Sequence, residues 1–340
     1  MPKLKPAESK NLFHYELKGE PNEELKAQLE KNEPIPHLTL DGEWNPAGYR
    51  TLVTDLMNSE YENDPTFKES VLLCDREETI VPIRDGNDST VRLWIYRPHS
   101  LKNETCAPAI VYVHGGGSVG GRLEDFIPHC SRMAVRTGTV VCAVGYRMVP
   151  DFKFPATMMD SYVSVKHVIE NAVPLGIDPN RIAISGDSAG GYQILATAAK
   201  LAQENESHLI KVARVSVAQI FDYFFTEPKE NMTLSESQAI QESDIIMTWM
   251  VGEDRERHLK ERNPLLFPGL ASDELLANYP PFIIVEEEFD NYVTPNARLA
   301  ERLKKAGRLL EYFCYPGTSH YGGHPNSDED FVRMFEEYLK

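Results

Sequence analysis

From about residue 78 to the end of the chain, short apolar runs alternate with segments long enough to form helices. Most of these runs are apolar at every position, which indicates strands that helices cover on both faces. The sequence therefore predicts an α/β fold with a mostly parallel, eight-stranded sheet flanked by helices. The predicted strands are Thr79–Arg84, Val91–Arg97, Ala109–Val113, Thr139–Val144, Arg181–Ser185, Val212–Ile220, Phe282–Glu286 and Leu309–Tyr315.

The first two predicted strands differ from the others because only the turn cluster Asp85–Asp88 separates them. A connection this short joins antiparallel strands, so we expect an antiparallel pair at the start of the sheet. The later strands are separated by segments of helix length. The predicted helices of this region are Phe126–Thr137, Ala156–Asn171, Ala189–Glu204, Pro295–Ala306 and Asp328–Leu339.

Two stretches do not follow the alternation of strands and helices. Residues 1–75 are polar and charged, with candidate helices at Asn22–Lys31 and Ala47–Ser59 and separating prolines that include Pro65. The stretch from Phe221 to about Leu270 is too long for a simple crossover and too apolar for a solvated loop. We interpret this second stretch as a cap over the carboxyl ends of the strands, to which the N-terminal segment contributes.

The charge of the chain argues against two classes of partner. Its 340 residues include 35 basic and 52 acidic ones, a net charge of −17 that repels nucleic acid and anionic membrane surfaces. No apolar run approaches the roughly 20 residues that span a bilayer, and the N-terminus lacks the apolar core of a signal peptide. Five scattered cysteines without C-x-x-C spacing favour reduced thiols over disulfides or a metal site. We expect a cytoplasmic protein that acts on small molecules.

A glycine-flanked serine follows the predicted strand Arg181–Ser185, in the run Gly186–Gly191 (GDSAGG). A nucleophile on a sharp strand-to-helix turn needs glycines two residues to either side, because the neighbouring chain passes close to it. The helix that starts at Ala189 also directs its positive end at the oxygen on which charge develops. Ser188 is therefore the candidate nucleophile, and a tight turn with an inert serine is the alternative.

Three glycines, Gly115, Gly116 and Gly117, follow His114 at the end of the predicted strand Ala109–Val113. Bare backbone here lets amide groups point at a ligand, as in an oxyanion hole. A flexible hairpin and a phosphate loop are the alternatives, and the absence of a following Lys-Ser/Thr disfavours the phosphate loop. His114 is interpreted as an orienting or packing residue and not as a base.

A serine nucleophile needs a base, and the base needs an acid that orients it. His320 lies in a glycine-rich loop after the last predicted strand, where an open α/β sheet gathers its site, and His324 is a rival. Asp290 follows the strand Phe282–Glu286, with the run Glu286–Glu288 as a competitor. The chain order Ser188, Asp290, His320 is the order expected of α/β-hydrolases.

With these motifs the chain resembles the hormone-sensitive-lipase-like carboxylesterases, also called family IV lipolytic enzymes, of the α/β-hydrolase fold. The resemblance covers about residue 78 to the C-terminus and includes two further blocks, Tyr146–Ala156 and Asn263–Leu265. It implies a helical cap formed by residues 1–75 and 221–261, over a catalytic domain of residues 76–220 and 262–340.

The resemblance also implies roles for single residues. Ser188 would be the nucleophile, His320 the general base and then acid, and Asp290 the orienting carboxylate. The amides of Gly116, Gly117 and Ala189 would hold the oxyanion, with Gly115 shaping the loop. Two departures from the family pattern, Tyr192 after the nucleophile motif and Tyr321 after the histidine, add bulk near the site.

These residues predict a serine hydrolase that cleaves short- to medium-chain carboxylic esters through an acyl-enzyme. An amidase, a deacetylase or a lactonase would use the same triad, and a ligand-binding relative without catalysis is the remaining alternative. We expect no cofactor and no metal, and a small-molecule ester as the partner. A homodimer is compatible with the sequence.

Overall fold

The computed structural model describes residues 19–21, 26, 45–83, 88–229, 232–320, 324 and 326–339. The candidate helix Asn22–Lys31, most of the turn cluster Asp85–Asp88 and Tyr321 lie outside the described residues. The eight strands are β1 Cys74–Pro82, β2 Thr90–Pro98, β3 Ala107–Val113, β4 Val140–Gly145, β5 Ile177–Asp187, β6 Val212–Ser216, β7 Phe282–Glu287 and β8 Leu309–Tyr315.

All eight strands form one sheet in the order β1-β2-β4-β3-β5-β6-β7-β8. β2 pairs antiparallel with both β1 and β4, and all later neighbours are parallel. The prediction of a mostly parallel sheet that opens with an antiparallel pair is therefore confirmed. Parallel strands bring their carboxyl ends to one edge of the sheet, and the loops that carry Ser188, Asp290 and His320 meet at this edge.

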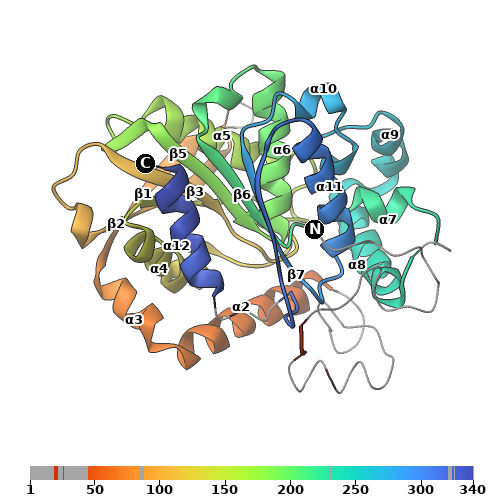
Figure 1. Ribbon diagram of the computed structural model, residues 1–340, viewed down its shortest axis with the longest axis horizontal. Helices are drawn as coiled ribbons and strands as arrows, with labels where there is room; N and C mark the ends of the chain where they lie inside the picture. Colours follow the sequence, from red (N-terminus) through yellow and green to blue (C-terminus); the bar gives the residue numbers. More distant parts are fainter. Residues whose placement is uncertain are drawn as a thin grey trace.

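Helices cover both faces of the sheet, as Figure 1 shows. One apolar layer joins the sheet to α5, α6 and α11, and a second layer joins the opposite face to α4 and α12. The described helices are α2 Pro46–Asn63, α3 Pro65–Leu72, α4 Ile127–Thr137, α5 Ala156–Glu170, α6 Ala189–Gln203, α7 Asp222–Thr226, α8 Leu234–Val251, α9 Arg255–Lys260, α10 Asp273–Leu276, α11 Val293–Lys305 and α12 Ser327–Tyr338. None of the helices in the described ranges is long and apolar enough to span a bilayer.

Two sequence expectations are corrected. The strand predicted over Val212–Ile220 ends at Ser216, because Val217 has a positive φ of 44° that turns the chain out of the sheet. Pro65 was interpreted as a separator, but it opens the helix α3, with the Asp64 side chain accepting from the Thr66 amide as the N-cap. Proline suits the first turn of a helix, where its missing N–H is not needed.

α2 and α8, which come from the two stretches interpreted as a cap, share a small apolar cluster. Tyr49 and Val53 of α2 pack there with Ile246 and Met250 of α8. In Figure 1, α2 and α3 run along the lower edge of the molecule, while α7, α8 and α9 gather on its right. The division into cap and catalytic domain stays a prediction.

Candidate active site

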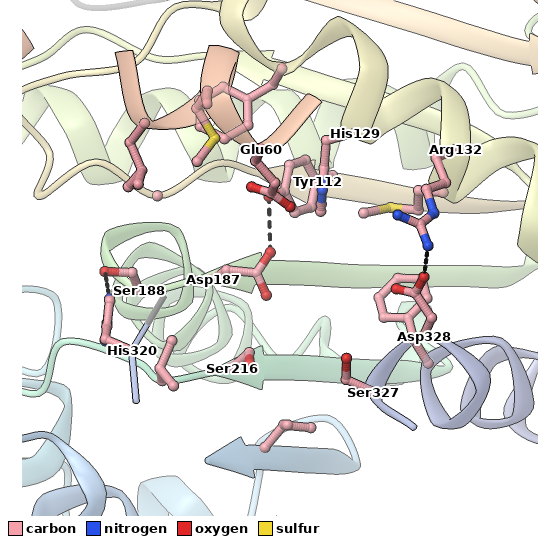
Figure 2. Close-up of a pocket in the computed structure, with 18 of the residues that line it drawn as sticks. Glu60, Tyr112, His129, Arg132, Asp187, Ser188, Ser216, His320, Ser327 and Asp328 are labelled. Carbon is pink, nitrogen blue, oxygen red and sulfur yellow. Dashed lines mark hydrogen bonds and ion pairs between the residues drawn. The ribbon is translucent and has the colours of Figure 1, made fainter. Parts of the chain in front are cut away.

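Three side chains from loops far apart in sequence form one hydrogen-bonded line at the carboxyl edge of the sheet. His320 Nε2 lies 2.9 Å from Ser188 Oγ, and His320 Nδ1 lies 2.6 Å from Asp290 Oδ2. The Asp290 side chain is fully buried and that of His320 is only 6% exposed. A carboxylate accepts a hydrogen bond, so it holds the proton on Nδ1 and leaves the Nε2 lone pair for the serine hydroxyl. Figure 2 shows the contact between Ser188 and His320.

The backbone at Ser188 has the strained geometry that the sequence predicts. Ser188 lies between β5 and α6 with φ 55° and ψ −119°, a region that side chains other than glycine rarely adopt. A Cβ on Gly190 would lie 1.9 Å from the carbonyl oxygen of Val113, and one on Gly186 would lie 2.5 Å from the backbone of Gly190. The two glycines therefore make room for the turn that exposes the hydroxyl.

The glycine loop after β3 lies against this turn. Gly116 and Gly117 have φ of 104° and 63°, and a Cβ on Gly115 would lie 3.3 Å from Ser188 Cβ. Among the described residues, no hydrogen bond uses the amides of Gly116, Gly117 or Ala189. These amides remain available to a substrate oxygen.

His114 supports the loop from below. It is buried between the rings of Phe126 and Tyr146, at centroid distances of 4.7 Å and 4.4 Å, and its Nδ1 lies 2.8 Å from the Gly115 carbonyl oxygen. Burial lowers the pKa of His114 to about 4, so its ring is neutral at physiological pH. The interpretation of His114 as a packing residue is confirmed.

The acidic run before Asp290 is buried and not solvated. Glu288 accepts the amides of Gly317 and Gly19, each at 2.9 Å, and Glu287 contacts the Thr318 hydroxyl. These contacts tie the loop of His320 to the loop of Asp290. The rival histidine, His324, instead stacks on Tyr315 at a centroid distance of 4.9 Å.

Tyr192 does not add bulk at the serine, contrary to expectation. Its ring is fully buried, and its hydroxyl donates to the Leu266 carbonyl at 2.5 Å. The ring also packs against Phe221 at a centroid distance of 5.1 Å. It therefore joins α6 to the segment after the insert.

A cavity of about 530 Å³ extends from Ser188 and His320 along the face of the sheet that α4 and α12 cover. Figure 2 shows its length, from Ser188 and His320 at one end to the ion pair of Arg132 with Asp328 at the other. Sequence analysis missed Arg214, which lines this cavity. A charged residue within the otherwise apolar run Val212–Ile220 was the signal that could have identified it.

Comparisons with known proteins agree with this architecture. A family model described as alpha/beta hydrolase fold matches residues 110–322. The chain is 33% identical over 249 residues to Carboxylesterase NlhH of Mycobacterium tuberculosis, covering 72% of this chain and 74% of that protein. It is 29% identical over 255 residues to Ethyl acetate hydrolase of Pseudomonas putida, covering 74% of each.

Solved structures show the same fold. An esterase of Pyrobaculum calidifontis superimposes with a TM-score of 0.72 at 23% identity, over 94% of this chain and 98% of that one. At this level of identity the similarity concerns the fold alone.

Proposed function

We propose, because the chain belongs to the α/β-hydrolase fold family and to its hormone-sensitive-lipase-like carboxylesterases, that it hydrolyses short- to medium-chain carboxylic esters through an acyl-enzyme on Ser188. The observation that carries the proposal is the line from Asp290 through His320 to Ser188, with spacings of 2.6 Å and 2.9 Å. Esters that are dissolved, and not aggregated fat, are the expected substrates.

The first half of the reaction forms the acyl-enzyme. His320 Nε2 takes the proton of Ser188 while Oγ attacks the ester carbonyl carbon, and Asp290 stabilises the resulting imidazolium. The carbonyl oxygen becomes an oxyanion, which accepts hydrogen bonds from the amides of Gly116, Gly117 and Ala189. When the tetrahedral intermediate collapses, the C–O bond to the alcohol breaks and His320 returns its proton to the leaving oxygen.

The second half repeats these steps with water as the nucleophile. His320 takes a proton from a water molecule, the hydroxide oxygen attacks the acyl carbon, and the same amides hold the second oxyanion. Collapse releases the carboxylic acid and returns the proton to Ser188. Both halves need a neutral imidazole at the start, so turnover falls on the acid side of the pH profile.

Replacing Ser188 with alanine tests the proposal. The Ser188→Ala variant should lose about 10⁴- to 10⁶-fold in kcat on p-nitrophenyl acetate. Ser207→Ala, on the short helix η3 Ser207–Leu209 remote from the site, is the matched control and should keep the parent rate. Turnover by Ser188→Ala at the parent rate would disprove the assignment of the nucleophile.

Amides and lactones pass through the same intermediates, so substrates must separate these activities. Matched ester, amide and lactone substrates at equal concentration should give the highest kcat/KM for the ester. A ligand-binding relative without catalysis would not react with an organophosphate probe, whereas the proposed enzyme is labelled on Ser188.

A further inference from the structure

The cavity beside Ser188 has two unlike walls. Its helical wall is apolar and includes Leu56 and Met57 of α2, Met133 of α4 and Phe331 of α12. Its opposite wall is the face of the sheet, where β5, β6 and β7 end in polar side chains. A pocket for a plain hydrocarbon chain would be apolar on all sides, because apolar binding depends on removing apolar surface from water.

Strand register gathers the polar residues of this floor. Asp187 pairs with Ser216, and Ser185 pairs with Arg214, so all four side chains point to one face of the sheet. Glu287 lies at the end of the neighbouring strand and also lines the cavity. Arg214 is two residues from Ser216 along β6, so the floor extends about 7 Å from the edge that holds Ser188.

The floor presents more hydrogen-bond donors than the protein uses. Asp187 accepts from the Tyr112 hydroxyl and from Arg214 Nη1, both at 2.9 Å. Arg214 Nη2 and Ser216 Oγ have no hydrogen-bond partner in the described part of the chain, although both residues are only 8% exposed. Burial raises the pKa of Glu287 to about 8, so this carboxyl also holds a proton at neutral pH.

These free donors decide which ligand the cavity accepts. A hydrocarbon chain would strip water from Arg214 and Ser216 and leave their donors without a partner, which costs binding free energy. An oxygen acceptor would replace that water. A carboxylate would meet the charge of Asp187, so the acceptor that fits best is neutral, such as a ketone, ether or hydroxyl oxygen.

We propose that Arg214 and Ser216, with Glu287, select esters whose arm in this cavity carries a neutral oxygen acceptor within about 7 Å of the reacting carbonyl. The apolar helical wall would contact the carbon skeleton of the same arm. This inference rests on the proposed esterase activity and names the substrate class for that site.

Two pairs of esters with equal numbers of heavy atoms test the proposal, one for each orientation of the substrate. The first pair is p-nitrophenyl 4-oxopentanoate against p-nitrophenyl 4-methylpentanoate. The second pair is 4-oxopentyl acetate against 4-methylpentyl acetate. In at least one pair, after correction for spontaneous hydrolysis, kcat/KM should favour the keto ester by about tenfold or more, as one hydrogen bond to a charged donor allows.

Variants assign the preference to the floor. Arg214→Met should reduce the keto preference to about one or below, and Ser216→Ala should reduce it several-fold while leaving the ion pair of Arg214 with Asp187 intact. Leu56→Met on the helical wall is the matched control and should keep the preference. If Arg214→Met does not fold, Ser216→Ala decides.

The outcomes separate this inference from the proposed function. Equal rates for both members of each pair, or a keto preference that survives in the folded floor variants, would overturn the inference while leaving an esterase. If the parent hydrolyses none of the four esters in a manner that depends on Ser188, the proposed function itself fails.

Discussion

Individual residues at the nucleophile turn are constrained by backbone contacts more than by chemistry. Ser188 keeps a positive φ because its amide donates to the Ser216 carbonyl at 2.8 Å and its carbonyl accepts the Tyr192 amide at 3.0 Å. Close backbone neighbours hold the turn from both sides. The hydroxyl is therefore positioned before any substrate binds, which is the kind of preorganisation that catalysis requires.

The first prediction compares two glycines. Gly190→Ala should be strongly destabilising, because the new Cβ would lie 1.9 Å from the Val113 carbonyl oxygen and only backbone could move. Gly307→Ala is the control, since its φ is 70° but nothing lies within 4 Å of the added carbon, and it should cost about 1–2 kcal/mol. Urea unfolding should show that Gly190→Ala costs at least about 2 kcal/mol more. Equal losses would contradict the packing argument.

The second prediction concerns Glu286, whose buried carboxyl has no hydrogen-bond partner among the described residues. Burial, with smaller contributions from Asp290 and Glu287, raises its pKa well above the ordinary 4.5. The folded protein then binds this proton more tightly than the unfolded chain, so its contribution to stability decreases as pH rises above 4.5. Glu286→Gln lacks this loss.

Measured by urea unfolding between pH 5 and pH 8, the stability of Glu286→Gln relative to the parent should increase by at most about 1.4 kcal/mol per pH unit. Glu311→Gln on β8 is the control, because Arg333 lowers the pKa of Glu311 and no such rise is expected in this range. A flat difference for Glu286→Gln would show that its carboxyl is ionised in the fold.

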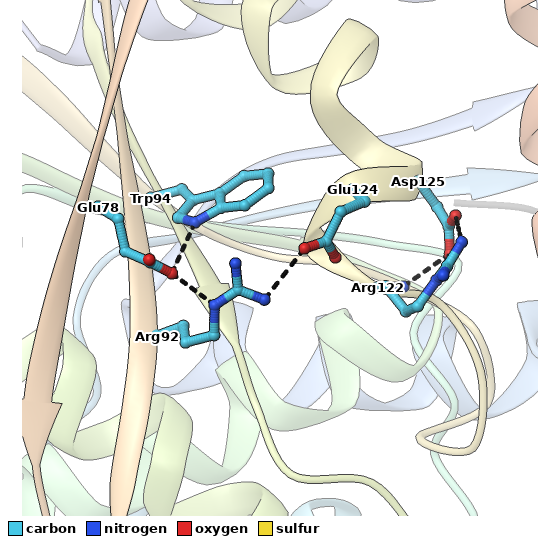
Figure 3. A network of polar contacts seen from close by, with 6 residues as sticks. All are labelled: Glu78, Arg92, Trp94, Arg122, Glu124 and Asp125. Carbon is cyan, nitrogen blue, oxygen red and sulfur yellow. Dashed lines mark hydrogen bonds and ion pairs between the residues drawn. The ribbon is translucent and has the colours of Figure 1, made fainter.

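At the scale of elements, polar contacts differ in value according to their burial. The Asp160 side chain of α5 is fully buried and accepts the Arg147 amide at 2.8 Å and Arg147 Nη2 at 2.7 Å. These bonds hold the segment after β4 against α5. A second network, in Figure 3, joins β1 and β2 at the surface, where Glu78 contacts Arg92 and accepts from Trp94 Nε1 at 3.0 Å.

The third prediction contrasts these two networks. Asp160→Ala leaves Arg147 without its buried partner and should lower the free energy of unfolding by about 3–5 kcal/mol. Glu78→Ala removes a contact whose side chains are 42% and 47% exposed, so water replaces it with a far smaller effect. Chemical denaturation of both variants checks the order. A loss for Glu78→Ala as large as that for Asp160→Ala would contradict it.

At the scale of the whole molecule, the sheet gathers the chemistry at one edge while its surface remains acidic. The proposed reaction needs an imidazole, a hydroxyl, a carboxylate and backbone amides, all supplied by loops at that edge. Within the described residues, no group of three or more histidine, cysteine, aspartate or glutamate side chains is arranged to hold a metal ion.

The fourth prediction follows from this set of groups. Dialysis against EDTA should leave kcat and KM for p-nitrophenyl acetate unchanged, because every proton transfer and charge in the proposed steps is assigned to a residue of the chain. Parallel treatment of a zinc hydrolase is the control for the chelator. Activity that is lost and then restored by a divalent cation would overturn the cofactor-free mechanism.

Local sequence determined much of this protein. The turn at Ser188, the glycine loop and the alternation of strands and helices depend on neighbouring residues, so their positions could be predicted. The α/β-hydrolase fold and an esterase function followed, and both agree with the comparisons. The triad roles stay a prediction that the distances support.

Only the tertiary structure decided which side chains face the cavity. Arg214 lines it because the register of β5 and β6 puts Arg214 on the face of Asp187, and Tyr192 is excluded because its hydroxyl binds Leu266 across the fold. Nor could local pattern show that the acidic run before Asp290 is buried. Such contacts join residues distant in sequence, and their energies depend on packing that no local pattern encodes.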